Sequence, residues 1–175
     1  MRSLASLAAG AALLYWPYLW CWIRKEDIDT YGLRWTFDRK VVFHTLLVTA
    51  TVLLLLTPIA LYWPWDVLPH HHSFREITNM AASGLAAAII EETFFRGWLQ
   101  TILRKKMPAV AAICIVNMIF APSHLIVSPY LISLATFFPG LIMGALREKY
   151  DNILPSIIFH FCGNIWAIWF FPSPF

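Results

Sequence analysis

Charged residues are scarce in this sequence. Of its 175 residues only 13% are Asp, Glu, Lys or Arg, whereas 59% are hydrophobic. About a quarter of a typical soluble domain is charged, so these charges are too few to cover the apolar surface in water. We therefore expect a lipid bilayer to surround the chain. The net charge of +3, without a basic stripe among exposed aromatic residues, gives no reason to expect nucleic acid as a partner.

Cysteine is also scarce, and its spacing argues against disulfides and against a structural metal site. Cys21, Cys114 and Cys162 lie far apart, each within or beside an apolar run, and no CxxC pair occurs. Buried, unreactive thiols are the expected state. Internal repeats and low-complexity segments are missing too. We therefore expect residues 1–175 to form a single integral-membrane domain.

Polar breaks divide the chain into six apolar segments, each close to the ~20 residues that cross a bilayer. The first segment is too long and too aromatic for a signal peptide, so we expect a retained membrane helix. The sequence predicts an all-α fold, a polytopic membrane helix bundle with about six transmembrane helices. The segments are Leu4–Ile23, Val41–Trp63, Ile77–Leu103, Ala109–Val127, Tyr130–Leu146 and Ile153–Phe171.

Basic residues fall on alternate connections between these segments. The connections 24–40, 104–108 and 147–152 hold ten of the thirteen Lys and Arg residues. The positive-inside rule places them in the cytoplasm and both termini outside, as in a multi-pass protein of a prokaryotic cytoplasmic (inner) membrane. The first connection mixes both signs of charge with Leu33, Trp35 and Phe37. Either an amphipathic interfacial segment or a solvated connector fits that pattern.

Ionisable residues inside the apolar segments form three groups. A charge near the middle of a bilayer costs at least ~2.5–3.5 kcal/mol, so such residues face the protein interior and pair. In the first group, Glu92 and Arg96 are four residues apart, share one helix face and can form an ion pair. Glu91 points elsewhere, toward small residues that include Gly84 and Ala88 and would let a neighbouring helix come close.

The other two groups centre on histidines. His124 follows Pro122, which removes a helix hydrogen bond and bends the fourth segment. His160 and Asn164 are four apart in the sixth segment and share a face. Gly163 lies between them and leaves space where a substrate or another backbone could approach.

These residue types favour hydrolysis of an acyl bond without a covalent intermediate. A carboxylate buried at low dielectric is a competent general base, so Glu91 with His124 could hold and deprotonate a water molecule. His160 and Asn164 are hydrogen-bond donors that could stabilise the oxyanion of a tetrahedral intermediate. A buried network of purely structural role is the alternative for Glu91, Glu92 and Arg96.

The three groups also resemble the motifs of a known family. The stretches "EETFFRGWL", "FAPSH" and "HFCGN" are similar to the EExxxR, FxxxH and HxxxN motifs of the CAAX-protease and bacteriocin-processing family, over a core of residues 77–171. Its members are glutamic intramembrane proteases, among them Ras-converting CAAX endopeptidases and myxosortase-like enzymes. The resemblance implies that Glu91 and His124 activate water and that His160 and Asn164 form the oxyanion hole. Glu92 and Arg96 would hold the first motif in shape.

The resemblance also implies a substrate class. Family members cut a membrane-anchored protein near its C-terminal tail, either a prenylated CAAX tail or a C-terminal sorting signal. Processing of a sorting signal is the reading we favour for this chain. The residues indicate no oligomeric state.

Two other interpretations stay open. A zinc enzyme is conceivable, but no HExxH motif occurs and Arg96 would oppose a cation, so we expect no metal or cofactor. Some relatives are immunity proteins, which makes a non-catalytic, peptide-binding membrane protein the second alternative. The complete set of motif residues favours an enzyme. The candidate zinc ligands are Glu91, Glu92, His124 and His160.

Histidines outside the motifs are not expected to take part in a functional site. His44 lies alone in the second segment, and a hydrogen bond to a neighbour is its expected role. The run His70–His72 falls in a connection that we predict to be solvated. Neither feature predicts a further site.

Overall fold

A computed structural model of the chain describes residues 2–33, 35–64, 66–126 and 128–172, and these form helices without a strand. The predicted all-α helix bundle is confirmed. Two predicted features, Arg34 in the first basic connection and Val127 at a segment end, lie outside the described residues. The α-helices are α1 (Arg2–Arg24), α2 (Arg39–Leu61), α3 (Phe74–Glu92), α4 (Gln100–Arg104), α5 (Ala109–Ser123), α6 (Phe137–Tyr150) and α7 (Leu154–Phe170). The other helices are the 3₁₀-helices η1 (Ile28–Tyr31), η3 (His124–Ile126) and η4 (Leu131–Thr136) and the π-helix η2 (Thr93–Leu99).

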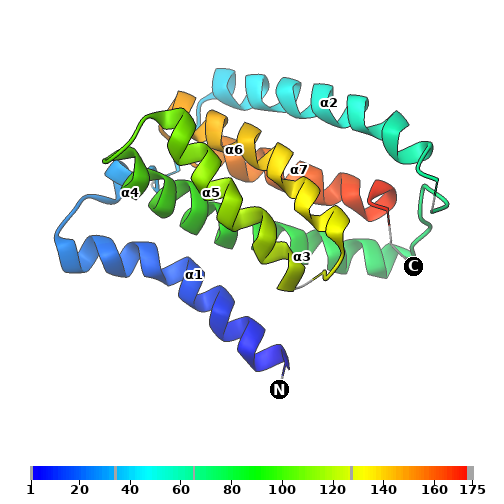
Figure 1. Cartoon of the computed structure of the whole chain (residues 1–175), viewed down its shortest axis with the longest axis horizontal. Helices are drawn as coiled ribbons and strands as arrows, with labels where there is room; N and C mark the ends of the chain where they lie inside the picture. Colours follow the sequence, from blue (N-terminus) through cyan, green and yellow to red (C-terminus); the bar gives the residue numbers. More distant parts are fainter. Residues whose placement is uncertain (1, 34, 65, 127, 173–175) are drawn as a thin grey trace.

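α7 is the central helix of the bundle. It packs against α2, α3 and α6, and α5 in turn packs against α6 (Figure 1). α1 packs against α3 and η2, while its N-terminal part diverges from the other helices (Figure 1). One apolar cluster lies beneath α1 and a second lies between η2, α5, α6 and α7. The second cluster comprises Phe95, Val116, Phe120, Met143, Leu146 and Phe159.

Several helices have the dimensions of membrane spans. Within the described residues, Arg39–Leu61, Ala109–Ile126 and Leu131–Tyr150 are long and apolar enough to cross a bilayer, and α7 is apolar but shorter. α1 has 23 residues, and a rise of 1.5 Å per residue makes it ~34 Å long, against ~30 Å of hydrocarbon. α3, η2 and α4 follow one another without a break from Phe74 to Arg104. Each of the six predicted segments therefore coincides with helix.

The three basic connections meet at one end of the bundle. Lys105 after α4 binds the carboxylate of Glu26 after α1, with 3.1 Å between Nζ and Oε2. Arg147 in α6 donates to Oγ1 of Thr101 in α4 at 3.0 Å. The sequence prediction that these connections share a side is confirmed. Which face of the membrane they occupy stays a prediction.

Part of the first connection is buried, and neither predicted description fits it. Tyr31 and Leu33 are 0% and 3% exposed, because Gly97 in η2 leaves room for them. A Cβ on Gly97 would come within 2.5 Å of Cδ2 of Leu33. The Tyr31 hydroxyl donates to Glu26, and the hydrogen bonds from Tyr31 and Lys105 hold the pKa of Glu26 below its usual value. This segment fastens α1 to η2; Trp35 and Phe37, further along, are exposed.

The histidine run at the opposite end lies in a connection with His71 exposed, as predicted, and its other two rings also contact the end of α7. Nε2 of His72 lies 3.0 Å from the carbonyl oxygen of Ile168, and Nε2 of His70 lies 3.2 Å from that of Phe171. The C-terminal carbonyls of a helix lack helical partners, and these rings supply them. The prediction for His44 is confirmed, because its Nδ1 lies 2.8 Å from the hydroxyl of Tyr150.

Candidate active site

The first motif lies where the α3 helix widens into a π-helix. α3 ends at Glu92, and η2 continues as a π-helix from Thr93 to Leu99. Such turns are rare and occur frequently at functional sites. The Thr93 hydroxyl donates back to the carbonyl oxygen of Ile89 at 2.7 Å, a contact that bends helices. Sequence reasoning assumed α-helix throughout this segment and missed the change.

Arg96 is fully buried, and its contacts link the first motif to two other helices. Its Nη1 lies 3.1 Å from Oε1 of Glu92, which is also 0% exposed, so the predicted ion pair is confirmed. Its Nη2 donates to Oδ1 of Asn117 at 3.1 Å and to the carbonyl oxygen of Gly140 at 3.3 Å. The guanidinium carbon lies 4.0 Å from the ring centroid of Phe120. One arginine therefore connects η2 with α5 and α6.

Position 140 requires glycine, because a side chain there would clash with Asn117 and Arg96. An added Cβ would lie 1.8 Å from Oδ1 of Asn117 and 3.0 Å from Nη2 of Arg96. We expect Gly140→Ala to lower the free energy of unfolding by at least ~2 kcal/mol, through overpacking and a lost charged hydrogen bond. Thermal unfolding in detergent measures this. Gly10→Ala is the control, since its Cβ would meet only Ile90 at an ordinary 3.7 Å; equal melting temperatures for the two variants would contradict the prediction.

His160 is held by the same buried carboxylate. Its Nδ1 lies 2.8 Å from Oε1 of Glu92, the oxygen that also receives Arg96. An ionised Glu92 can only accept, so Nδ1 of His160 is the donor and Nε2 faces away from Glu92. Nε2 lies 3.9 Å from Oε2 of Glu91. Sequence reasoning gave Glu92 a structural role and missed its contact with His160, since the two residues are 68 positions apart.

His124 approaches Glu91 from the other side. α5 ends at Ser123, directly after Pro122, and His124 begins the short helix η3. Its Nδ1 lies 3.0 Å from the carbonyl oxygen of Phe120, which can only accept, so Nδ1 carries the proton and Nε2 is free to accept. Nε2 lies 4.0 Å from Oε2 of Glu91. Two imidazole nitrogens thus face one carboxylate oxygen at nearly equal distances.

Glu91 itself is only partly enclosed. Its side chain is 27% exposed, compared with 0% for Glu92. Its Oε2 is nonetheless buried, and no described residue lies within hydrogen-bonding distance of that oxygen. The sequence prediction that the two adjacent carboxylates differ in surroundings is therefore confirmed.

Asn164 lies one turn beyond His160 on α7 and contacts α3. Its Nδ2 donates to the carbonyl oxygen of Gly84 at 2.9 Å. A Cβ on Gly84 would come within 3.0 Å of Cβ of Asn164, so the glycine allows α7 to approach α3, as the small residues predicted. An amide nitrogen has two N–H groups, and this contact uses one of them. The structure thus brings Glu91, Glu92, Arg96, His124 and His160 into direct contact, with Asn164 adjacent.

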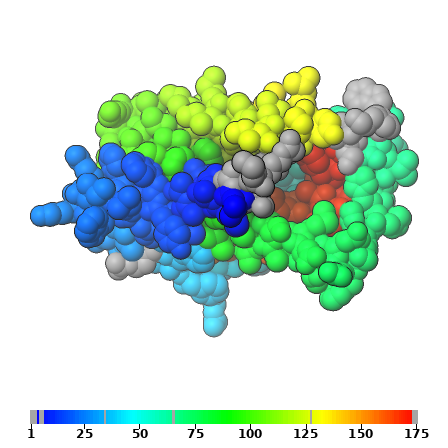
Figure 2. Space-filling model, turned by 90° about the horizontal axis from the view of Figure 1, so that it is seen from below, coloured from blue at the N-terminus to red at the C-terminus, as the bar shows by residue number. Residues whose placement is uncertain are grey.

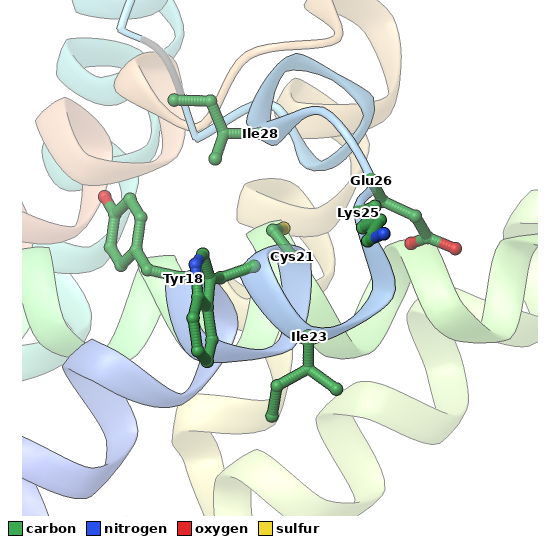
Figure 3. A pocket seen from close by; sticks show the side chains of 7 residues that line it. Tyr18, Cys21, Ile23, Lys25, Glu26 and Ile28 are labelled. Carbon is green, nitrogen blue, oxygen red and sulfur yellow. The ribbon is translucent and has the colours of Figure 1, made fainter.

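A cavity lies away from the motif residues, at the C-terminal end of α1. It measures about 790 Å³ and lies among Tyr18, Cys21 and Trp22 of α1 and Ile28 of η1, with Lys25 and Glu26 at its rim. Figure 3 shows Ile28 opposite the side chains of α1. None of the motif residues lines this cavity. Over the described part of the chain, no three His, Cys, Asp or Glu side chains converge to hold one metal ion.

The family to which these residues belong is shown by sequence comparison. A family described as Type II CAAX prenyl endopeptidase Rce1-like matches residues 73–166, over half of the chain, from the N-cap of α3 through Asn164. The chain belongs to this family. The predicted resemblance is thereby confirmed, and as a Rce1-like protein the chain is a peptide hydrolase with a protein substrate, embedded in a membrane by its apolar helices. Curated proteins and solved structures gave no match.

Proposed function

We propose that this Rce1-like protein is a glutamic intramembrane endopeptidase that cuts near the C-terminal tail of a membrane-anchored protein. The observation that supports it best is Oε2 of Glu91, which faces Nε2 of His124 at 4.0 Å and Nε2 of His160 at 3.9 Å. Both separations are too long for a direct hydrogen bond and suit one bridging water molecule. The proposed catalytic core is residues 77–171.

In the proposed reaction, Glu91 and His124 activate that water. Oε2 of Glu91 takes one proton, and Nε2 of His124 accepts a hydrogen bond from the other. The water oxygen bonds to the carbonyl carbon as the carbonyl electron pair moves to oxygen. Collapse of this intermediate breaks the C–N bond, and the proton held by Glu91 passes to the departing nitrogen. The products are a carboxylic acid and an amine, without a covalent intermediate.

His160 and Asn164 are proposed to stabilise the oxyanion. Asn164 has a second N–H beyond the one that Gly84 receives. Nε2 of His160 donates only when the ring carries two protons, one of which Nδ1 shares with the carboxylate of Glu92. Glu92 and Arg96 therefore act as positioning residues. Hydrogen-bond donors that point at the developing negative charge in a water-excluded site typically lower the activation barrier by a few kcal/mol each.

The substrate and the membrane are finer proposals. We propose a C-terminal sorting signal as the substrate, and a prokaryotic cytoplasmic membrane with the basic end of the bundle in the cytoplasm. The charge asymmetry supports the orientation, because the connections that meet at that end hold most of the Lys and Arg residues.

A peptide panel tests the activity and the substrate together. Purified protein in proteoliposomes is given three tails: a prenylated CAAX peptide, the same peptide without prenyl, and a tail that ends in an apolar sorting helix. Mass spectrometry identifies each cut. We expect cleavage of the sorting tail. If only the prenylated peptide is cleaved, the proposed substrate is wrong and a prenylated CAAX tail is the substrate instead.

The same assay separates the two alternative functions. A zinc enzyme would lose activity with a chelator and regain it with added Zn²⁺, whereas we expect chelator to have no effect. If the wild type cuts none of the three tails but retains one of them in a pull-down, the non-catalytic, peptide-binding reading replaces the protease.

A further inference from the structure

Gly163 lies in the middle of α7 with open space beside it. A Cβ built on it would meet no atom within 4 Å, whereas a Cβ on Gly84, Gly97, Gly140 or Gly144 would lie 3.0 Å or less from a neighbour. Those four glycines are explained by close packing of helices, and Gly163 is not. Glycine in a helix interior costs ~0.5–1 kcal/mol relative to alanine, so its presence here lacks a reason in stability.

Gly163 belongs to the half of α7 that is partly exposed. α7 packs against three helices, yet every residue from His160 to Ala167 is partly exposed, while most residues from Pro155 to Phe159 are buried. Figure 2 shows α7 (red) at the floor of a hollow, between the yellow segment around η4 and the green segment of α3. The second half of α7 therefore borders a hollow that opens to the surface, and no neighbouring side chain fills the position beside Gly163.

Gly163 lies on the same side of α7 as His160 and Asn164. Residues of a helix are spaced by 100°, so Gly163 lies 60° from His160 in one direction and Asn164 lies 40° from it in the other. Asn164 is turned toward Gly84 on α3, so Gly163 is turned away from α3. His160 between them contacts both glutamates of the first motif. A group placed against Gly163 is therefore adjacent to any bond held at His160.

We infer that Gly163 forms the wall of a subsite for a bulky substrate side chain next to the scissile bond, so that it determines specificity. This inference rests on the proposed protease function. A hydrophobic pocket discriminates side chains by size because each added methylene must find room, and one methylene is worth ~10–200-fold in kcat/KM. A side chain at position 163 would occupy the space that the substrate's side chain requires.

The test compares peptide selectivity of the wild type, Gly163→Ala and Gly163→Leu. The probe is the cleaved tail from the proposed-function assay, resynthesised with Gly, Ala, Leu or Phe on either side of the scissile bond. We expect Gly163→Leu to lower kcat/KM at least ~10-fold for Leu or Phe at one of these positions, with Gly and Ala nearly unaffected and Gly163→Ala intermediate. Cys162→Leu is the size-matched control, since residue 162 lies 200° from His160 on the same helix.

The outcomes distinguish a failure of the proposed subsite from a failure of the proposed protease function. Melting temperatures in detergent identify a folding defect, and Gly163→Ala is expected to melt no lower than the wild type, because its Cβ meets nothing. If the wild type cuts the panel and both Gly163 variants keep its ranking of side chains, the subsite is wrong and the protease stands. If all side chains lose activity equally in both variants, Gly163 does not set specificity. A wild type that cuts no peptide removes the protease and the subsite together.

Discussion

Replacing Glu91 by glutamine is expected to abolish peptide hydrolysis while leaving the fold intact. The amide keeps the shape of the side chain but cannot take a proton from water, and general-base catalysis contributes ~10²–10⁴-fold. We therefore expect kcat/KM to fall ~10²–10⁴-fold, with KM nearly unchanged. Stability should hardly change, because Oε2 of Glu91 accepts no hydrogen bond from the described residues and its side chain is 27% exposed.

Glu76→Gln is the matched control for that experiment. Glu76 lies on the same helix as Glu91 and closes the capping box with Ser73, a role that glutamine also fills. This variant should keep full activity. Full activity of Glu91→Gln on a tail that the wild type cuts would show that another group is the base, and His160 with Glu92 behind it would be the next candidate.

Replacing Glu92 by glutamine should instead unfold the protein readily. The neutral amide leaves the Arg96 charge uncompensated at 0% exposure, and breaking a buried pair by neutralising one partner costs about 3–5 kcal/mol. His160 loses its anionic partner in the same step. We expect a marked fall in melting temperature in detergent, together with loss of activity in whatever fraction remains folded.

A second arginine pair provides the comparison. Arg147 and Asp151 are also four residues apart in α6 and the turn after it, but the Asp151 side chain is 78% exposed. Asp151→Asn is expected to cost ~0–1 kcal/mol, because solvent screens the pair. The two substitutions remove the same charge at the same helical spacing, but only Glu92 is buried and also contacts His160. Similar destabilisation by both would contradict a special role for the Glu92–Arg96 pair.

Local spacing predicted the helices and the pairs that lie within one helix. Intervals of four residues put Glu92 beside Arg96, and hydropathy located all six segments, because both depend only on neighbours along the chain. The approach of His124 to Glu91 was expected from their chemistry, but most other contacts between distant segments were out of reach. The bond from Glu92 to His160 and the bonds of Arg96 to Asn117 and Gly140 depend on how whole helices pack.

Other features of the structure have local causes that no pattern in the sequence predicts. Residues Tyr31 to Leu33 looked like a surface connector because charges flank them, and their burial depends on the room left by Gly97. The π-helix after Glu92 has no sequence marker of its own. Asn117 is a polar residue in an apolar segment, and only the fold shows that its Oδ1 accepts a hydrogen bond from Arg96.

The contacts of Arg96 also bear on how a substrate could enter the bundle. Its guanidinium in η2 donates hydrogen bonds to both α5 and α6. Separating those helices would leave a positive charge without these partners in the hydrocarbon region. That seam is therefore expected to stay shut through the catalytic cycle. α1, whose N-terminal part diverges from the other helices, is a helix that Arg96 does not bond, and it is the one we expect to move aside. A crosslink between α1 and α3 should then slow substrate entry, whereas one between α5 and α6 should leave it unchanged.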